Sequence, residues 1–417
     1  MKIFKNKKRK YIIISGLVSL FAIIGLCITY YNSIPKEEPL IGTYINGTYS
    51  ESLPSKGSGY AVEKIVCDNN KNASWDYDKW GIKLSNWGTR SRCNIYFKSL
   101  ESFTIANKTF YLDEMLRCPT MNSDGTVTVT GAEDTYGYLC KAKDAYGDSY
   151  YYRGNVTNNY VKFADKYWRI VRINGDGTVR VIYDGTSAHA NSESSKDRQI
   201  GTSAFNSSSD DNAYVGYMYG KTGASTYAET HANTNNSTIK TYLDTWYENN
   251  IKGTSNEQYI ADNIFCNDRS FASNNSGTGA GKSETYYRWY TFANSSNNNK
   301  MMLTCLQKND AFTVNDTSNG NGALTYGVGL VTTDEVVLAG GWNLENSKYY
   351  LHSGQYSWTM SPHSFGGSSA DGRYVHSNGD ADINNFVFGT NGARPVLNLS
   401  SDVLKNGNGT ASDPYYA

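Results

Sequence analysis

Two pairs of carboxylates have a spacing that could support catalysis or metal binding. Glycoside hydrolysis needs two acids facing each other across a cleft, and the chain offers Asp334 beside Glu335 and Asp380 near Asp382. Adjacent residues of a strand point to opposite faces, so Asp334 and Glu335 make a poor catalytic pair. Asp380 and Asp382 lie in the segment SNGDADINN, where their oxygens would suit calcium. A plain turn is the alternative, because segments rich in Asn, Asp and Gly usually form turns.

Aromatic side chains gather shortly before this segment. A 17-residue span contains five of them, namely Trp342, Tyr349, Tyr350, Tyr356 and Trp358. Such rings can stack on the apolar faces of sugars while amide and carboxylate groups bind the hydroxyls. The first four are therefore candidate ligand-binding residues, whereas Trp358 is expected to pack in the core. Burial of the whole set is the alternative.

Familiar catalytic motifs are missing from the sequence. The segment GTGAGKS (277–283) is similar to a phosphate-binding loop, but Ser276 stands where that motif requires its first glycine. The five histidines are scattered, with no H-E-x-x-H pattern, and no G-x-S-x-G occurs. The sequence therefore predicts binding without catalysis, and an extracellular enzyme acting on cell-wall or host glycans is the alternative.

The N-terminus predicts a membrane anchor. Residues 1–10 contain six basic side chains and form a cytoplasmic tail, and residues 11–31 carry no charge. A helix of 21 residues, rising about 1.5 Å per residue, crosses a hydrocarbon core of about 30 Å. The basic flank stays inside the cell, so the rest of the chain is expected outside. A cleaved signal peptide and lipidation at Cys27 are the alternatives, but no small-x-small cleavage site follows, and Leu26 precedes the cysteine.

Composition supports an extracellular, loop-rich β protein. The chain has 35 tyrosines and 39 glycines, and only 19% of its residues are charged. Residues 11–417 hold 33 basic and 39 acidic side chains, a net charge of −6. Without a basic face to neutralise phosphates, a nucleic-acid partner is not expected.

Three segments are expected beyond the anchor. Residues 32–59 contain Pro, Ser and Gly and are predicted to be a linker. Residues 60–103 are predicted to form a small β module closed by a disulfide, because a core of about 45 residues usually needs a cross-link. Residues 104–417 form the main ectodomain.

Six cysteines lie outside the predicted anchor, an even number that suits an oxidising compartment. Sequence proximity pairs Cys67 with Cys93 and Cys118 with Cys140. The remaining pair is then Cys266 with Cys305. Other pairings stay open at this stage, and a zinc site is a weaker alternative because no C-x-x-C or Cys/His spacing supports it.

The strongest strand signal spans residues 160–183. Two β-branched and aromatic runs flank the turn NGDG (174–177), which predicts a central hairpin covered on both faces. Arg169, Arg172 and Arg180 recur along these runs and are expected to be solvated; an anion-binding stripe is the alternative.

Two further segments follow this hairpin. Residues 186–236 are rich in Ser, Asn and Gly and predict a long surface loop. Ser237 is expected to cap an amphipathic helix that reaches Ile251, because the apolar residues between them recur at helical spacing.

Six motifs occur in a fixed order: SYYYRGNV (149–156), YWRIVRINGDG (167–177), IFCNDRS (264–270), LVTTDEV (330–336), WTMSP (358–362) and GARPVLNL (392–399). From about Cys118 to the C-terminus, their succession resembles a family of uncharacterised, membrane-anchored surface proteins from gut Firmicutes. The last two motifs also resemble, remotely, the C-type-lectin-like fold shared with sulfatase-modifying factors.

These resemblances imply an α+β fold, a C-type-lectin-like mixed domain with a twisted antiparallel sheet, one or two helices and long loops. Catalytic sulfatase-modifying proteins rely on cysteines near their C-terminus, whereas this chain has none after Cys305. The resemblance therefore implies a binding scaffold rather than an oxidase.

The sequence as a whole predicts a single-pass cell-membrane protein with a cytoplasmic N-terminus and an extracellular ectodomain that binds a glycan or another surface ligand. A structural or adhesive role in the envelope is a further alternative. Calcium is the one cofactor that the sequence suggests.

Overall fold

The computed structural model describes residues 40–68, 72–77, 79–85, 92–113, 117–291 and 299–417. The predicted anchor, residues 11–31, lies outside this set. Within it, no helix combines the length and the hydropathy that a membrane crossing requires. The chain divides into two units between Ser99 and Leu100, and each is described by itself.

The smaller unit contains a four-stranded sheet of order β2-β1-β6-β3 and a separate hairpin, β4-β5. The strands are β1 (Leu40–Ile45), β2 (Thr48–Ser50), β3 (Tyr60–Cys67), β4 (Asn72–Asp76), β5 (Gly81–Ser85) and β6 (Arg92–Ser99). The strand β1 pairs in parallel with β6. Strand β1 lies in residues 32–59, the segment predicted to be a linker. The unit's buried core is small and consists of Val62, Trp75, Ile95 and Phe97.

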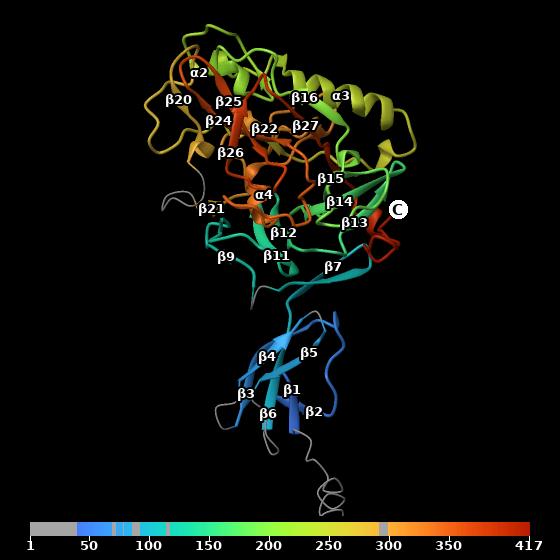
Figure 1. Cartoon of the computed structure of the whole chain (residues 1–417). Coiled ribbons are helices and arrows are strands. Elements are labelled where there is room, and N and C mark those ends of the chain that lie inside the picture. Colours follow the sequence, from blue (N-terminus) through green and yellow to red (C-terminus); the bar gives the residue numbers. More distant parts are fainter. Residues whose placement is uncertain (1–39, 69–71, 78, 86–91, 114–116, 292–298) are drawn as a thin grey trace, which may run out of the picture. The chain divides into compact units, whose positions relative to one another are not determined.

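The larger unit is built on a seven-stranded antiparallel sheet of order β11-β12-β14-β15-β28-β23, in which β13 pairs with β14 (Figure 1). Its strands are β11 (Gly137–Asp144), β12 (Gly147–Gly154), β13 (Tyr160–Phe163), β14 (Lys166–Ile173), β15 (Val179–Gly185), β23 (Val328–Gly329) and β28 (Val396–Leu399). The predicted hairpin is confirmed as β14-β15, with Gly177 at a φ of 84° in its turn. Trp168 and Val171 are both buried, so both faces of β14 are covered.

A second sheet has the order β16-β27-β24-β25-β26, with β20 paired to β24. Its strands are β16 (Gly201–Ala204), β20 (Thr285–Tyr286), β24 (Ser357–Phe365), β25 (Ala370–Val375), β26 (Ile383–Phe386) and β27 (Thr390–Ala393). One hydrophobic core continues across both sheets. Apolar packing therefore joins the two sheets of the larger unit in a single core.

Short ladders join the connecting segments. They are formed by β7 (Ser102–Ile105) and β8 (Lys108–Tyr111); β9 (Thr120–Met121), β10 (Val127–Thr128) and β21 (Lys300–Met301); β17 (Met218–Tyr219) and β18 (Asn235–Asn236); and β19 (Phe265–Cys266) and β22 (Ala311–Phe312). The short 3-10 helices are η1 (Lys196–Arg198), η2 (Asn212–Val215), η3 (Glu257–Tyr259), η4 (Arg288–Tyr290), η5 (Lys308–Asp310) and η6 (Ser401–Leu404).

The α-helices of the described residues are α2 (Tyr227–Thr230), α3 (Thr238–Asn250) and α4 (Thr333–Leu338). Helix α3 confirms the predicted amphipathic helix, and the Ser237 side chain accepts a hydrogen bond from the Lys240 N–H. Asp334 and Glu335 lie in α4 rather than in a strand. The reason is a capping box in which Thr332 and Glu335 satisfy each other's backbone N–H groups.

The segment 186–236 is not the surface loop that its composition predicts. It contains β16, η2 and α2, and it buries Arg198, Phe205 and Tyr217. A few large side chains of this segment enter the core, although most of its residues are small and polar. The average polarity of the segment therefore does not predict that it is buried.

Three disulfides join Cys67 to Cys93, Cys118 to Cys140 and Cys266 to Cys305, the pairs predicted from their spacing. The protein is thus mostly β, with few short helices, several antiparallel sheets and a disulfide content that is typical of extracellular domains.

Candidate functional site

The aromatic residues predicted to bind ligand are mostly buried. Tyr349 and Tyr350 are 0% exposed and Trp342 is 7% exposed. The Tyr349 hydroxyl donates to the Gly379 carbonyl, so even its polar end is used inside the fold. Tyr356 is 46% exposed. Three of the four rings of the expected ligand surface thus lie in the core that joins the two sheets.

The predicted calcium loop has the geometry of a turn. The Asp380 Oδ1 accepts the N–H of Asp382 at 2.7 Å, the local bond that commonly stabilises such turns. Asp382 forms an ion pair with Arg373, with 2.7 Å between Nη1 and Oδ1. The positive charge beside the Asp382 carboxylate thus comes from Arg373, where the prediction expected a calcium ion. Among the described residues, no group of His, Cys, Asp and Glu side chains could hold a metal ion.

Arg169, Arg172 and Arg180 are buried, which corrects the expectation that they are solvated. They belong to a larger set of buried arginines that also includes Arg153, Arg198, Arg269, Arg373 and Arg394. Irregular segments leave carbonyl oxygens without partners, and a guanidinium offers five N–H donors. Arg153, for example, donates to the carbonyls of Val337 and Leu338 at the end of α4.

Glu335 is the centre of the most densely charged part of the core. Its Oε1 lies 3.1 Å from the Arg172 Nε and 2.6 Å from the Arg180 Nε. Arg172 also pairs with Asp144 at 2.7 Å. Burial alone would raise the pKa of Glu335, but Arg180 and Arg172 hold it below its ordinary value, so the carboxylate stays ionised.

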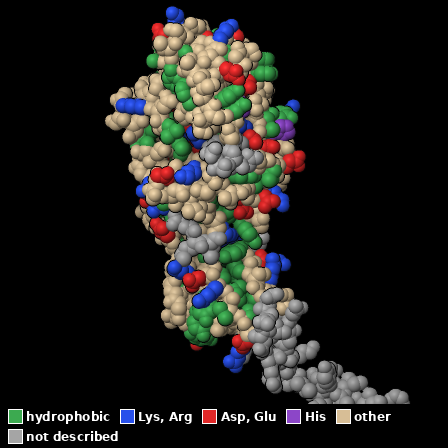
Figure 2. All heavy atoms as spheres, turned by 90° about the vertical axis from the view of Figure 1, so that its left-hand side faces the viewer, with side chains coloured by type: hydrophobic (Ala, Val, Ile, Leu, Met, Phe, Trp, Pro, Cys, Tyr) green, Lys and Arg blue, Asp and Glu red, His purple; other side chains and the backbone are tan. Residues whose placement is uncertain are grey.

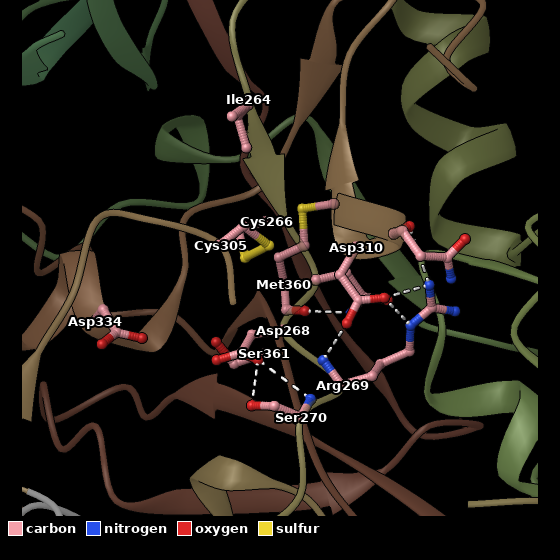
Figure 3. Close-up of a disulfide and its surroundings, with 12 residues drawn as sticks. Ile264, Cys266, Asp268, Arg269, Ser270, Cys305, Asp310, Asp334, Met360 and Ser361 are labelled. Carbon is pink, nitrogen blue, oxygen red and sulfur yellow. Dashed lines mark hydrogen bonds and ion pairs between the residues drawn. A yellow bond between two sulfur atoms is a disulfide. The ribbon is translucent and has the colours of Figure 1, made fainter. Parts of the chain in front are cut away.

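A small cavity adjoins these charges and is lined by Cys266, Asp334 and Glu335, among others. Its volume is about 20 Å³, which is room for about one water molecule. Asp334 is already engaged by Arg288, by the Trp289 indole N–H and by the Met302 N–H. Figure 3 shows the Cys266–Cys305 disulfide beside a further buried pair, Arg269 and Asp310. This region therefore stabilises the fold and has no room for an organic substrate.

A larger hollow lies beside the start of α3, and we call it the α3 groove. Its volume is about 440 Å³, within the range usual for sites that bind small molecules. Its lining is Ser203, Asn206, Ser207, Tyr219, Asn236, Ser237, Thr238, Thr241, Tyr242 and Thr245. Helix α3 supplies four of these residues and the adjacent strand β16 supplies Ser203, while the other five lie in β17, β18 and the segments that join these elements. Helix α3 and β16 lie side by side (Figure 1). The lining, as far as the described residues define it, contains hydroxyl, amide and phenol groups and no charged side chain.

Hydrogen bonds inside the protein use many of the groove's donors. The hydroxyls of Thr241 and Thr245 donate to the carbonyls one helical turn earlier, at 3.0 and 2.9 Å. The Tyr242 hydroxyl donates to the Ile200 carbonyl at 3.2 Å. A hydroxyl that donates its hydrogen still has two lone pairs. The groove therefore presents oxygen acceptors and suits a ligand that brings O–H or N–H donors.

The Tyr219 phenol of the groove is a neutral group. Burial raises the pKa of Tyr219 above its ordinary value, with a smaller contribution from Tyr214, whose ring centroid is 5.4 Å away. A neutral ring with a hydroxyl at its edge can contact both the apolar and the polar parts of a ligand.

Sequence reasoning did not find the α3 groove. Uncharged Ser, Thr and Asn side chains resemble those of any loop, and the lining comes from segments that are separate in the sequence. One signal was present, since Thr238, Thr241 and Thr245 recur along one side of the predicted helix. Threonine has a lower helix propensity than most residues, so a ridge of three is unusual.

Comparison with protein-family models, with curated proteins and with solved structures finds no match for this chain. The α3 groove is therefore interpreted from its own chemistry.

Proposed function

We propose that this chain is a bacterial cell-surface protein that binds a neutral glycan in the α3 groove and does not catalyse a reaction. The observation that carries the proposal is the groove's lining of hydroxyl, amide and phenol groups without charge. Sugar hydroxyls are donors that match its oxygen acceptors. A charged ligand would lose its hydration shell there without gaining an opposite charge.

The distribution of charge agrees with a neutral ligand. Figure 2 shows a face of the molecule on which charged side chains are scattered among uncharged polar ones. No field of one sign covers this face to attract a polyanion. Beyond residue 10 the net charge of the sequence is −6, which also disfavours nucleic acid as a partner.

The wider setting of the proposal comes from the sequence. It includes anchoring by residues 11–31 with a cytoplasmic N-terminus, membership of the surface-protein family from gut Firmicutes, and a C-type-lectin-like scaffold. Three disulfides support an extracellular location for the ectodomain. Antiparallel sheets, a principal helix and long connections support the scaffold.

The alternative of a glycan-cleaving enzyme lacks comparable support. Three of the carboxylates that the sequence offered as acids are engaged elsewhere: Glu335 with Arg172, Asp334 with Arg288 and Asp382 with Arg373. A glycosidase needs one carboxyl group to donate a proton and a second to act as base or nucleophile.

Glycan binding tests the proposal directly. The full chain, purified with its disulfides intact, is applied to an array of neutral and acidic glycans. Saturable binding to a neutral class is expected, with an affinity at least tenfold lower in the double variant Thr241→Val/Thr245→Val, because two acceptors are lost. The matched control is Thr317→Val, an exposed loop threonine outside the groove. Absence of binding to neutral glycans, or equal affinity of variant and control, would refute the proposal.

A further inference from the structure

Two large apolar side chains lie exposed at the edge of the second sheet. Phe386 and Phe388 are 50% and 53% exposed, and their rings are nearly parallel, with centroids 5.4 Å apart and planes inclined by 5°. Val387 between them is fully buried. Strand β26 ends at Phe386, and the chain turns there, because the Gly389 N–H donates to the Phe386 carbonyl. Within this turn Val387 enters the core and both phenylalanines face solvent. We call this pair of rings the Phe platform.

The Phe platform is next to the α3 groove. The Asn206 N–H donates to the Val387 carbonyl at 2.9 Å, and Asn206 is part of the groove's lining. On its other side, the Val387 N–H donates to the Ala370 carbonyl at 3.0 Å. One backbone hydrogen bond thus joins the segment that carries the two rings to the groove wall, so a ligand that extends from the groove toward Val387 would approach the rings.

We infer that the glycan is an oligosaccharide, with one sugar unit in the α3 groove and a neighbouring unit stacked on the Phe platform. This inference rests on the proposed glycan-binding function. A pyranose has a polar rim of hydroxyls and an apolar face of C–H groups. The groove supplies acceptors for the rim, and two parallel phenyl rings supply an apolar area for the face.

The chemistry of the platform also restricts the type of sugar. Phenylalanine offers no hydrogen-bonding group, so the platform does not select a hydroxyl pattern. It requires a flat C–H face, which a β-linked chain of sugars with equatorial hydroxyls presents. The ligand class is therefore a neutral, β-linked oligosaccharide, and affinity should increase with the number of units.

The test uses the full chain and the β-1,4-linked oligomers of glucose and of N-acetylglucosamine, from one to six units, in calorimetric titrations. Wild-type affinity is expected to rise about tenfold when the chain becomes long enough to reach the platform. Phe386→Ser/Phe388→Ser should keep the affinity for short oligomers and lose this rise. Thr241→Val/Thr245→Val should lower the affinity at every length.

The control is Phe271→Ser, since Phe271 is 44% exposed and lies outside the groove's lining. It should behave as wild type, and unchanged thermal midpoints should show that the variants are folded. If the platform variant keeps the rise with chain length, the inference fails while the proposed function stands. Absence of binding at every length refutes both. A concentration-dependent dimer that only the platform variant abolishes, without an effect of chain length, would identify the rings as a contact between two copies and overturn the inference.

Discussion

Arg172 lies directly opposite Arg180 across the β14-β15 strand pair, so two like charges face each other inside the core. Like charges at opposite positions of a sheet repel each other. Here Glu335 accepts hydrogen bonds from both guanidinium groups, and Asp144 neutralises the remaining charge. The main sheet therefore depends on a carboxylate from helix α4.

Replacing Glu335 with Gln should destabilise the protein by about 3–5 kcal/mol, because two buried guanidinium groups lose their shared counter-charge. Urea denaturation of wild type and variant at neutral pH measures the difference. Glu345→Gln is the matched control, since Glu345 is exposed and should change stability by less than about 0.5 kcal/mol. Equal midpoints for the two variants would show that the buried ion pairs contribute nothing.

The stabilisation by Glu335 should depend on pH. Its pKa is lowered in the folded state, so the contribution is complete above its ordinary value of 4.5 and is lost as the pH falls through the folded-state pKa. The gap between wild type and Glu335→Gln should thus shrink in acid. Denaturation midpoints from pH 7 downward measure it, and a gap that stays constant below pH 4 would contradict this assignment.

Asp371 should show the opposite pH dependence. Burial raises its pKa from 3.8 to about 6, against a weaker effect of the Asn384 amide. Its neutral form is favoured in the folded state, so stability is complete below 3.8 and declines as the pH rises to about 6. At pH 7.5, Asp371→Asn should therefore be more stable than wild type by about 1 kcal/mol, a figure reduced for partial solvent exposure.

Thermal midpoints at pH 3.5 and 7.5 measure the effect of Asp371→Asn. The exposed Asp210 provides the control variant Asp210→Asn, for which little change is expected at either pH. A variant that is no more stable than wild type at pH 7.5 would mean that the Asp371 carboxylate is well solvated.

The Cys67–Cys93 disulfide should be essential to the smaller unit. Among the described residues, the buried apolar cluster of that unit has only four members, and the loss of such a bridge costs about 3 kcal/mol. Cys67→Ala/Cys93→Ala should make residues 40–99 sensitive to protease while the rest of the chain stays resistant. Cys118→Ala/Cys140→Ala, in the larger unit, is the comparison. Persistent protection of residues 40–99 would show that the small core suffices.

Gly154 should not tolerate a side chain. Its φ is 82°, and a Cβ atom there would lie 2.0 Å from the Tyr136 carbonyl oxygen. Gly154→Ala should therefore cost more than about 2 kcal/mol in the free energy of unfolding. Gly366→Ala is the control, because its Cβ would meet nothing within 4 Å. If both variants unfold at the same denaturant concentration, the strand end must be able to move.

Local signals explain which parts of the fold the sequence predicted. The hairpin turn at 174–177 and the Ser237 cap of α3 each depend on a few neighbouring residues. The environment of Arg172 and Arg180 depends on Glu335, which is 163 and 155 residues away in sequence. Without that partner, the two arginines would be expected to face solvent. The sequence pattern therefore predicted solvent exposure, whereas both side chains are buried.

The candidate site was harder to predict for a related reason. Rings such as Tyr349 are as suitable for a core as for a ligand, and only the packing of the two sheets decides between these roles. A backbone hydrogen bond between Asn206 and Val387 joins the wall of the α3 groove to the segment that carries the Phe platform. No local sequence pattern predicts this bond. Residue types led to the expectation of a glycan ligand, whereas the place that we propose for it depends on tertiary contacts.

The order of the disulfides has a consequence for biosynthesis. The three bridges enclose consecutive, non-overlapping stretches of chain, 67–93, 118–140 and 266–305. As the chain emerges from its N-terminus, each cysteine that lacks a partner meets its native partner before any other thiol of these pairs appears. An oxidase that simply joins consecutive cysteines beyond residue 31 therefore produces this set, and these three bridges do not require a disulfide isomerase.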